Sequence, residues 1–440
     1  MSYPAYPNYK DSGVEWLGEV PAHWGISKLK HLARIRNGRD YKIVEVESGG
    51  YPVIGSGGEF ARANDFLYDG ESVLLGRKGT IDKPLYINGP FWTVDTMFYT
   101  ELSHRVDGRF LYYYATCFQF GQYSTNTALP SMAQEDLANI YMAAPGPSEQ
   151  ALIAAFLDHE TARIDALVEE QQRLIELLKE KRRAVISHAV TKGLDPDVPM
   201  KDSGVEWIGE VPKHWNVVRI KNVSSFLTSG PRGWSNFIND DGEDVFLQSG
   251  DLDDRLNVFF NKANRISTPQ GAEGIRTRLK NNDVVVCITG ANTGRVAVVA
   301  QVDERVYVNQ HLGLIRPQSS LCCSRFLGYS LASEGGQTYF NVEQYGLKEG
   351  LSLVNLAEAP ATLPPIIEQK KIAQHIDTQL SRLDGLSTDA TVAIKLLLER
   401  RSALISAAIT GKIDVRGWQA AREADPSEML MAAEEWATYG

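Results

Sequence analysis

The sequence predicts an α+β protein with a pseudo-twofold internal repeat: two globular domains with mixed, twisted β-sheets, joined by two long antiparallel coiled-coil helices. Three observations lead to this prediction. A helical stretch occurs twice at an offset of 219 residues, and 10 of 19 positions are identical between residues 177–195 and 396–414. A 15-residue segment also occurs twice, and β-like runs fill the regions that follow it. Internal repeats fix the architecture before single elements are considered.

The 15-residue segment, which we call the strap, is KDSGVEWLGEVPAHW at residues 10–24 and KDSGVEWIGEVPKHW at residues 201–215. Glycine and proline interrupt it, and its tryptophans offer apolar anchors, so we expect an extended segment packed on a hydrophobic surface. A binding role for the tryptophans is the alternative. The predicted domains are residues 1–146 (strap and first globular domain), 147–192 (first long helix), 193–366 (strap and second globular domain), 367–414 (second long helix) and 415–440 (acidic tail).

The two globular domains are predicted from short β-like runs separated by glycine turns. The strap copies lie 191 residues apart, so the second domain is 28 residues longer than the first. Strands are expected at residues 51–54, 72–75, 91–94, 244–248, 283–289 and 295–300. Helices are expected at residues 110–120, where a strand is the alternative, and at residues 324–332.

The long helices carry an apolar residue every 3.5 positions, which is the spacing of a coiled-coil seam. The predicted pairing residues are Ile153, Leu157, Ile164, Leu167, Leu174 and Leu178 in the first helix and Ile372, Ile376, Leu383, Leu386, Leu397 and Leu404 in the second. The alternative is an independent amphipathic helix on each domain. In an antiparallel pair the first strap would lie at the end of the second helix, so we expect the N-terminus near Ile413.

Bulk properties indicate a folded protein and exclude several classes. The 440 residues are 43% hydrophobic, yet no apolar run approaches 18 residues, so we expect no membrane span. The first ten residues lack the apolar region of a secretory signal. Four cysteines without a CxxC pair predict reduced thiols in a cytoplasmic protein. A formal charge of −10 argues against a general polyanion binder but allows a locally basic face.

We find no catalytic or metal-binding motif in the sequence. A P-loop has four residues between its glycines, whereas residues 290–294 (GANTG) have three and lack the following lysine. Residues 363–366 (LPPI) lack the polar first residue and the aromatic last residue of an adenine methyltransferase motif. The eight histidines are scattered. We therefore expect a non-catalytic chain that holds no metal or cofactor.

Polar loops follow a β-like run in each globular domain, at residues 77–80 and 289–295. Arginine and asparagine side chains can pair with base edges, and lysine and threonine commonly hold phosphate. The candidate DNA contacts are Arg77, Lys78, Thr80, Arg232, Trp234, Arg276, Arg278, Thr289, Asn292, Thr293, Arg295 and Gln310. Each residue alone is also compatible with an ordinary turn or surface position.

From residue 10 to residue 414 the chain resembles the specificity subunit of type I restriction-modification systems. The resemblance is carried by the two straps, by the segment 364–373 (PPIIEQKKIA) and by the two similar helix ends. Residues 77–80 (RKGT) and 308–311 (VNQH) also fit. The first helix departs from the pattern, because residues 147–150 (PSEQ) lack the full Pro-Pro-x-x-Glu-Gln form.

The resemblance implies that each globular domain is a target-recognition domain reading one half of a split, asymmetric site in double-stranded DNA. The paired helices would separate the domains and dock two modification subunits, which would be N6-adenine methyltransferases carrying S-adenosylmethionine. Restriction subunits using ATP and Mg²⁺ would add translocation and cleavage. The alternatives are a stand-alone DNA-modifying enzyme with an unrecognised site, and a coiled-coil adaptor that binds only protein.

Overall fold

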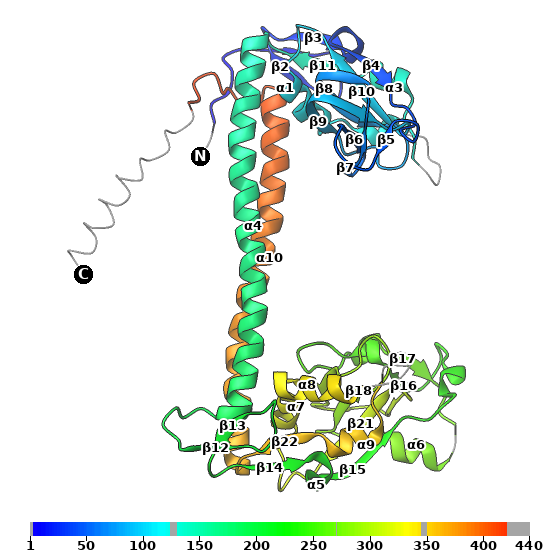
Figure 1. Cartoon of the computed structure of the whole chain (residues 1–440), viewed down its shortest axis with the longest axis vertical. Coiled ribbons are helices and arrows are strands. Elements are labelled where there is room, and N and C mark those ends of the chain that lie inside the picture. Colours follow the sequence, from blue (N-terminus) through cyan, green and yellow to red (C-terminus); the bar gives the residue numbers. More distant parts are fainter. Residues whose placement is uncertain (1–2, 124–129, 270, 345–349, 420–440) are drawn as a thin grey trace, which may run out of the picture. The chain divides into compact units, whose positions relative to one another are not determined.

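The computed structural model describes residues 3–123, 130–269, 271–344 and 350–419 (Figure 1). The chain divides into two units. Unit 1 contains the residues up to Gln171 and those from Val392 onward, and unit 2 contains Gln172 to Thr391. Each unit therefore holds one strap, one globular domain and one half of each long helix, which is the repeat that the sequence predicts.

Unit 1 begins with the strap, an antiparallel hairpin of β1 (Tyr9–Asp11) and β2 (Glu19–Pro21). Its globular domain is a mixed seven-stranded sheet in the order β4-β10-β8-β9-β6-β7-β5, in which β6 and β9 run parallel. The strands are β4 (Ala33–Asn37), β5 (Glu45–Val46), β6 (Tyr51–Gly55), β7 (Gly58–Ala63), β8 (Tyr68–Gly76), β9 (Leu85–Thr93) and β10 (Met97–Leu102). Helices α1 (Gly108–Ala115), α2 (Phe120–Tyr123) and α3 (Gln134–Ala138) follow, and β11 (Tyr141–Ala144) pairs with β3 (Gly25–Lys28).

Unit 2 repeats this plan with a strap hairpin of β12 (Met200–Asp202) and β13 (Glu210–Pro212). Its globular domain has a four-stranded sheet, β15-β21-β18-β19, and a three-stranded sheet, β17-β16-β20. The strands are β14 (Asn216–Arg219), β15 (Ser224–Ser229), β16 (Asp244–Leu247), β17 (Asn264–Ile266), β18 (Val284–Cys287), β19 (Val296–Val298), β20 (Val306–Val308), β21 (Leu312–Pro317) and β22 (Pro360–Leu363), which pairs with β14. The helices are α5 (Ile220–Val223), α6 (Ala272–Thr277), α7 (Ser324–Ala332), α8 (Glu334–Glu343) and α9 (Leu353–Glu358).

The two globular domains share a sheet core. The order β4-β10-β8-β9 in unit 1 corresponds to β15-β21-β18-β19 in unit 2, with the same antiparallel pairings. The predicted strands are confirmed as elements, with boundaries that differ by a few residues. The helix predicted at residues 110–120 is α1, which ends at Ala115, and the helix predicted at residues 324–332 is α7.

The long helices are α4 (Pro147–Lys192) and α10 (Ile366–Ile409). In unit 1 the first turns of α4 and the last turns of α10 share one core, which contains Ile153 and Ile409, and Arg401 pairs with Asp165 at 2.8 Å. In unit 2 the last turns of α4 and the first turns of α10 share the other core, and Arg182 pairs with Asp384 at 2.8 Å. The predicted antiparallel pairing is confirmed.

Most of the predicted seam residues are covered, but three of them are exposed. Ile153, Leu157, Ile164, Ile372 and Ile376 are buried, and Leu178, Leu383, Leu397 and Leu404 are half-buried. In contrast, Leu167, Leu174 and Leu386 are 42%, 39% and 51% exposed. These three leucines are therefore less covered than the predicted seam requires.

The first strap and the end of α10 lie together in unit 1, as predicted from the order of the repeats. The backbone N–H of Asp414 donates to the carbonyl oxygen of Pro4 at 2.7 Å, and the Tyr9 hydroxyl donates to the carbonyl oxygen of Gly411 at 3.0 Å. Helix α10 ends at Ile409, five residues before the predicted boundary at residue 414, because Gly411 adopts a left-handed conformation with φ of 73°.

Candidate nucleic-acid interface

The strap of unit 1 is held by one carboxylate at the start of α4. Trp24 is fully buried, and its indole Nε1 donates to Glu149 Oε1 at 3.1 Å. The second carboxylate oxygen, Oε2, lies 2.9 Å from His23 Nε2. The Tyr6 hydroxyl also donates to Glu149 Oε1, at 2.7 Å. Trp24 therefore packs in the core, as the preferred interpretation of the strap predicted.

Unit 2 builds the same joint at the start of α10. Trp215 is fully buried and donates from Nε1 to Glu368 Oε1 at 3.0 Å. His214 Nε2 lies 2.9 Å from Glu368 Oε2. Strap sequence and helix sequence recur together because a buried indole N–H needs an acceptor, which this glutamate supplies.

The glutamine after each glutamate connects the long helix to the globular domain. Gln150 is 1% exposed; its amide donates to the carbonyl oxygens of Pro145 and Arg105 at 2.8 and 3.0 Å and accepts from the Asp107 N–H at 2.9 Å. Gln369 is fully buried and bonds in the same way to Pro364, Leu321 and Cys323, at 2.8, 2.9 and 2.7 Å. The departure of residues 147–150 from the Pro-Pro pattern thus leaves this joint intact.

A third contact, which the sequence analysis missed, fixes each globular domain to its long helix. Tyr113 and Arg109 of α1 both donate to Asp158 of α4, the hydroxyl at 2.6 Å. Burial and the hydrogen bond to Asp158 raise the pKa of Tyr113 to about 12. The matching residues in unit 2 are Arg325, Tyr329 and Asp377, with the tyrosine hydroxyl at 2.5 Å from the carboxylate. The repeated pattern Arg-Phe-Leu-x-Tyr at residues 109–113 and 325–329 is the signal that would have revealed it.

These joints leave one end of each sheet free to carry loops. In unit 1 the Arg77 N–H donates to the carbonyl oxygen of Thr96 at 2.8 Å, and the Met132 N–H donates to the carbonyl oxygen of Arg77 at 2.9 Å. A Cβ at Gly38 would lie 2.0 Å from the carbonyl oxygen of Val94, so this backbone approach requires glycine. The loops after β4, β8 and β9 therefore converge at one end of the sheet.

Unit 2 brings the corresponding loops together with the same backbone contacts. The Ile288 N–H donates to the carbonyl oxygen of His311 at 2.9 Å, and the Leu351 N–H donates to the carbonyl oxygen of Ile288 at 2.7 Å. Gly230 matches Gly38, since a Cβ there would lie 2.0 Å from the carbonyl oxygen of Val308. The predicted correspondence between residues 77–80 and 289–295 holds, because both loops connect the third and fourth strands of the shared sheet order.

The structure brings most, but not all, of the candidate DNA contacts to these loop ends. In unit 1, Arg77, Lys78 and Thr80 share the loop after β8. In unit 2 the residues at or beside the converging loops are Arg232, Thr289, Asn292, Thr293, Arg295 and Gln310. Arg276 and Arg278 lie elsewhere, in a hollow beside β15. Contact with DNA stays a prediction for all of them.

Several candidates in unit 2 have structural partners. The Asn292 amide donates to the carbonyl oxygen of Ser249 at 3.3 Å, and Arg295 pairs with Asp254 at 3.0 Å. The Thr293 hydroxyl donates to the carbonyl oxygen of Gly290 at 2.7 Å. Such side chains hold the loop in shape, so their first role is to position the backbone of the tip.

Trp234 is a correction to the candidate set. Its side chain is 5% exposed, and its ring packs 5.6 Å from the ring of Tyr307 and 6.4 Å from that of Phe246. A ring enclosed in this cluster has no free face on which a base could stack. No local pattern indicates this burial, because Pro231-Arg-Gly-Trp234 has the composition of an exposed turn.

Ion pairing separates the arginines of the second globular domain into two groups. Seven pair with a carboxylate: Arg219, Arg255, Arg265, Arg295, Arg305, Arg316 and Arg325. Within the described part of unit 2, Arg232, Arg276 and Arg278 have exposed side chains and no carboxylate within ion-pair distance. These three guanidinium groups are available to an external anion.

The same division holds in the first globular domain. Arg36, Arg62 and Arg109 pair with Glu101, Glu59 and Asp158. Among the residues described there, Arg34, Arg39, Arg77 and Arg105 have no carboxylate partner. Arg77 instead donates to the carbonyl oxygen of Asp95 at 3.1 Å, which leaves its charge uncompensated at the loop end.

Other classes of site find little support in the described residues. No group of three or more histidine, cysteine, aspartate or glutamate side chains in the ranges above is arranged to hold a metal ion. None of the helices in those ranges is both long enough and apolar enough to cross a membrane.

Comparison with known proteins gives one consistent result. The family model described as "Type I restriction modification DNA specificity domain" matches residues 21–177 and 212–395. Over 435 residues the chain is 21% identical to the type I restriction enzyme EcoBI specificity subunit of Escherichia coli, covering 93% of this chain and 90% of that protein. It is 22% identical over 431 residues to the MjaVIII specificity subunit of Methanocaldococcus jannaschii, covering 90% and 94%.

Solved structures show the same fold. A chain from a structure concerned with complex assembly and conformational transition of the type I R-M system superimposes with a TM-score of 0.70, at 15% identity, covering 90% of this chain and 99% of that one. The HsdS subunit from Thermoanaerobacter tengcongensis gives a TM-score of 0.52 at 16% identity, covering 90% and 98%.

Proposed function

Since this chain belongs to the type I restriction modification DNA specificity family, we propose that it reads a split site in double-stranded DNA, with one half-site for each globular domain. The observation that carries the proposal is the pair of converging loop ends. Both are held by the same backbone contacts around Gly38 and Gly230, yet their side chains differ. A common scaffold with different tips suits the reading of two unlike half-sites.

The chemistry of the loop ends favours DNA. Arg39 and Arg77 in unit 1 and Arg232 in unit 2 carry uncompensated charge at these ends. Guanidinium groups can pair with the major-groove edge of guanine or with phosphate. The first globular domain holds 12 basic and 13 acidic residues between residues 25 and 144, so phosphate affinity would be shared with partner subunits.

Docking of two modification subunits is the second part of the proposal. Leu167 and Leu386 occupy equivalent positions of α4 and α10 and are 42% and 51% exposed. Leu177 and Leu396 form a second equivalent pair, 52% and 58% exposed. Each unit thus exposes one leucine of each pair, as expected if two copies of one partner helix pack on the chain.

Catalysis and cofactors would belong to the partners. In this proposal the modification subunits supply S-adenosylmethionine and N6-adenine methyl transfer, and restriction subunits supply the reactions that use ATP and Mg²⁺. This chain would be a non-catalytic cytoplasmic subunit that holds no cofactor. The absence of a catalytic motif in the sequence supports this assignment over a stand-alone enzyme.

The test is to map N6-methyladenine across the genome of cells that carry this chain and its modification subunit. We expect a two-part methylated motif that disappears when this chain is deleted. An unchanged methylation pattern, with both proteins expressed and bound to each other, would favour the adaptor alternative. Methyl transfer by the purified chain alone would instead favour the enzyme alternative.

Substitutions in the loops test which globular domain reads which half-site. Arg77→Ala should relax specificity in one half-site and Arg232→Ala in the other, each by about 1–3 kcal/mol at the affected position if the arginine contacts a base. Arg62→Ala is a matched control, because this exposed arginine pairs with Glu59 away from the loop end. A change in both half-sites from one substitution would contradict the assignment of one domain to each.

A further inference from the structure

The uncompensated arginines also gather at a second place in each unit, beside the first strand of the shared sheet. In unit 2 a hollow of about 660 Å³ is lined by Ser225, Phe226, Ile275, Arg276, Arg278, Lys280, Tyr307 and Arg316. Arg316 pairs with the buried Asp283 at 2.7 Å, but Arg276 and Arg278 are exposed and have no carboxylate partner among the described residues. Every charged residue among the described residues that line this hollow is a cation.

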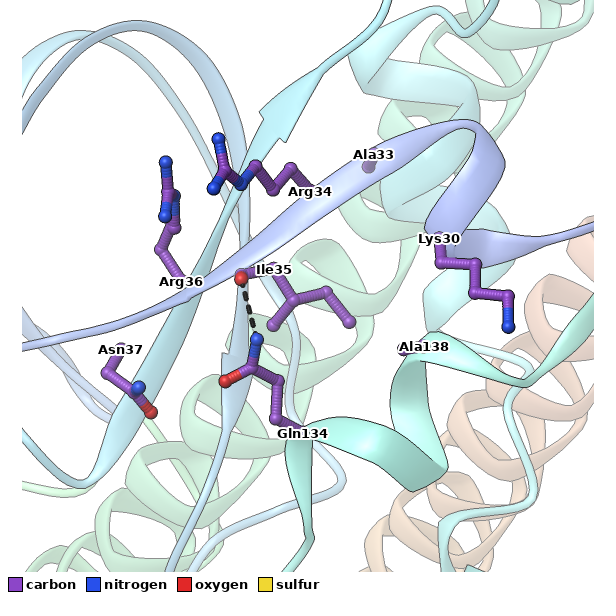
Figure 2. A pocket seen from close by; sticks show the side chains of 8 residues that line it. All are labelled: Lys30, Ala33, Arg34, Ile35, Arg36, Asn37, Gln134 and Ala138. Carbon is purple, nitrogen blue, oxygen red and sulfur yellow. Dashed lines mark hydrogen bonds between the residues drawn. The ribbon is translucent and has the colours of Figure 1, made fainter.

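Unit 1 has a basic hollow of about 290 Å³ beside β4, lined by Lys30, Ala33, Arg34, Ile35, Arg36, Asn37, Gln134 and Ala138. Figure 2 shows Arg34 and Arg36 extending from the same side of β4, while Gln134 of α3 reaches the strand and donates to the carbonyl oxygen of Ile35 at 3.0 Å. Arg36 pairs with Glu101, whereas Arg34 is exposed and without such a partner in the described ranges. Here too, all charged lining residues are cations.

Both hollows lie beside the first strand of the shared sheet, but different elements complete them: α3 in unit 1, and α6, β20 and β21 in unit 2. β4 and β15 are the terminal strands of the shared sheet order, and each pairs with the strand that follows it in that order. Each strand leads directly to the required glycine, Gly38 or Gly230, at the loop end. In a chain with a net charge of −10, two hollows lined by cations beside corresponding strands favour an anionic ligand.

We propose that the hollows beside β4 and β15 bind the phosphate backbone of the DNA whose bases the adjacent loop ends read. This inference rests on the proposed function and assigns a separate role within it. Phe226 lies four residues before Gly230, about 13 Å at the rise of a strand, which corresponds to about four base pairs along DNA. The hollow would thus hold a phosphate flanking the half-site and fix the register of the loop end.

The chemistry distinguishes this role from base reading. Arg276, Arg278 and Arg34 are exposed, and no described carboxylate fixes their guanidinium groups in one orientation. Unlike the arginines at the loop ends, these groups lie beside the strand, and attraction to phosphate does not depend on the base sequence. The hollows should therefore add affinity for any duplex without changing the preferred sequence.

The experiment measures duplex binding by the full chain assembled with its modification subunits, at several KCl concentrations. The probes are a duplex containing the methylated motif and an unrelated duplex of equal length. The variants are Arg276→Gln/Arg278→Gln and Arg34→Gln. We expect the double variant to lose the same factor, on the order of tenfold, for both duplexes, and to make the slope of log K against log[salt] less steep by about 2. Arg34→Gln should change the slope by about 1.

Matched controls remove the same charge elsewhere in each globular domain. Arg62→Gln in unit 1 and Arg265→Gln in unit 2 replace exposed arginines that pair with Glu59 and Glu304. They should leave the slope within experimental error of the unmodified complex. Size-exclusion chromatography and circular dichroism establish that each variant is folded and assembled before binding is measured.

Three results would overturn the phosphate assignment. One is a salt slope in the hollow variants equal to that of the controls, with sequence preference intact. Another is a changed methylation motif, which would mean that the hollow reads bases. The third is loss of subunit assembly without weaker DNA binding by the assembled fraction, which would indicate an acidic protein surface as the ligand. Failure of the unmodified complex to prefer its motif would instead overturn the proposed function itself.

Discussion

Units 1 and 2 agree most closely where strap, helix and globular domain meet, and least at the loop ends. Glu149 and Glu368 accept from a buried tryptophan at 3.1 and 3.0 Å, and each lies 2.9 Å from a histidine. The loop after β8 presents Arg77 and Lys78, whereas the loop after β18 presents Thr289 and Asn292. The contacts between strap, long helix and globular domain are thus the same in both units, whereas the loop-end side chains differ. A common scaffold with different loops allows each domain to recognise a different ligand sequence.

The largest effect in this comparison should follow loss of the buried glutamine at either joint. Gln150→Leu and Gln369→Leu each remove the side-chain partner of two carbonyl oxygens and one N–H, of which one carbonyl bond is fully buried, so each should destabilise its own unit by about 2–4 kcal/mol. Urea titration with hydrogen-exchange mass spectrometry resolves the two units. Gln374→Leu, at an exposed site of α10, is the control. Losses of unfolding free energy that differ by more than about 1 kcal/mol between the two variants would contradict the equivalence of the two glutamine contacts.

A smaller effect that differs between the units is expected at the glycines that end the long helices. Gly193 and Gly411 have φ of 77° and 73°, so alanine costs about 1–2 kcal/mol at each. A Cβ at Gly411 would also lie 2.3 Å from Pro21 Cδ, whereas at Gly193 the nearest atom, Trp215 Cζ2, is 3.2 Å away. Gly411→Ala should therefore cost about 1–3 kcal/mol more than Gly193→Ala in the same titration. Equal costs would show that the first strap can shift.

The smallest effect concerns alkaline pH. The pKa of Tyr113 is raised from 10.0 to about 12 by burial and by its hydrogen bond to Asp158, so the folded state favours the neutral phenol. Its contribution is complete below pH 10 and is lost as the pH rises toward 12. When the pH is raised from 9 to 11.5, the free energy of unfolding of unit 1 should fall less in the Tyr113→Phe variant than in the unmodified chain. The difference should be on the order of 1 kcal/mol. An identical loss in both proteins, measured by urea titration, would contradict this assignment.

Most of the architecture could be predicted because the strap and the long helix each occur twice in the sequence. The straps and the long helices have fixed spacings, and their order alone predicted an N-terminus near Ile413, which the hydrogen bond between Asp414 and Pro4 confirms. The burial of Trp234 was not predictable, because its neighbours Phe246 and Tyr307 come from strands distant in sequence. Pairing of charges is equally non-local. Arg276 and Arg295 look alike in the sequence, but among the described side chains Arg295 meets a carboxylate, that of Asp254, and Arg276 does not.

The contact between the first strap and the end of α10 has a consequence for synthesis on the ribosome. Unit 2 is one continuous segment, Gln172 to Thr391, so it can fold as soon as that segment has emerged. Unit 1 is discontinuous: the core that encloses Trp24 also contains Ile405, Ile409 and Val415. The core around Trp24 is therefore completed only after the end of α10 has emerged. During translation the first strap can bind Glu149 once α4 has emerged, but its contact with the end of α10 forms only after unit 2 has been made. Unit 1, which emerges first, is therefore completed last.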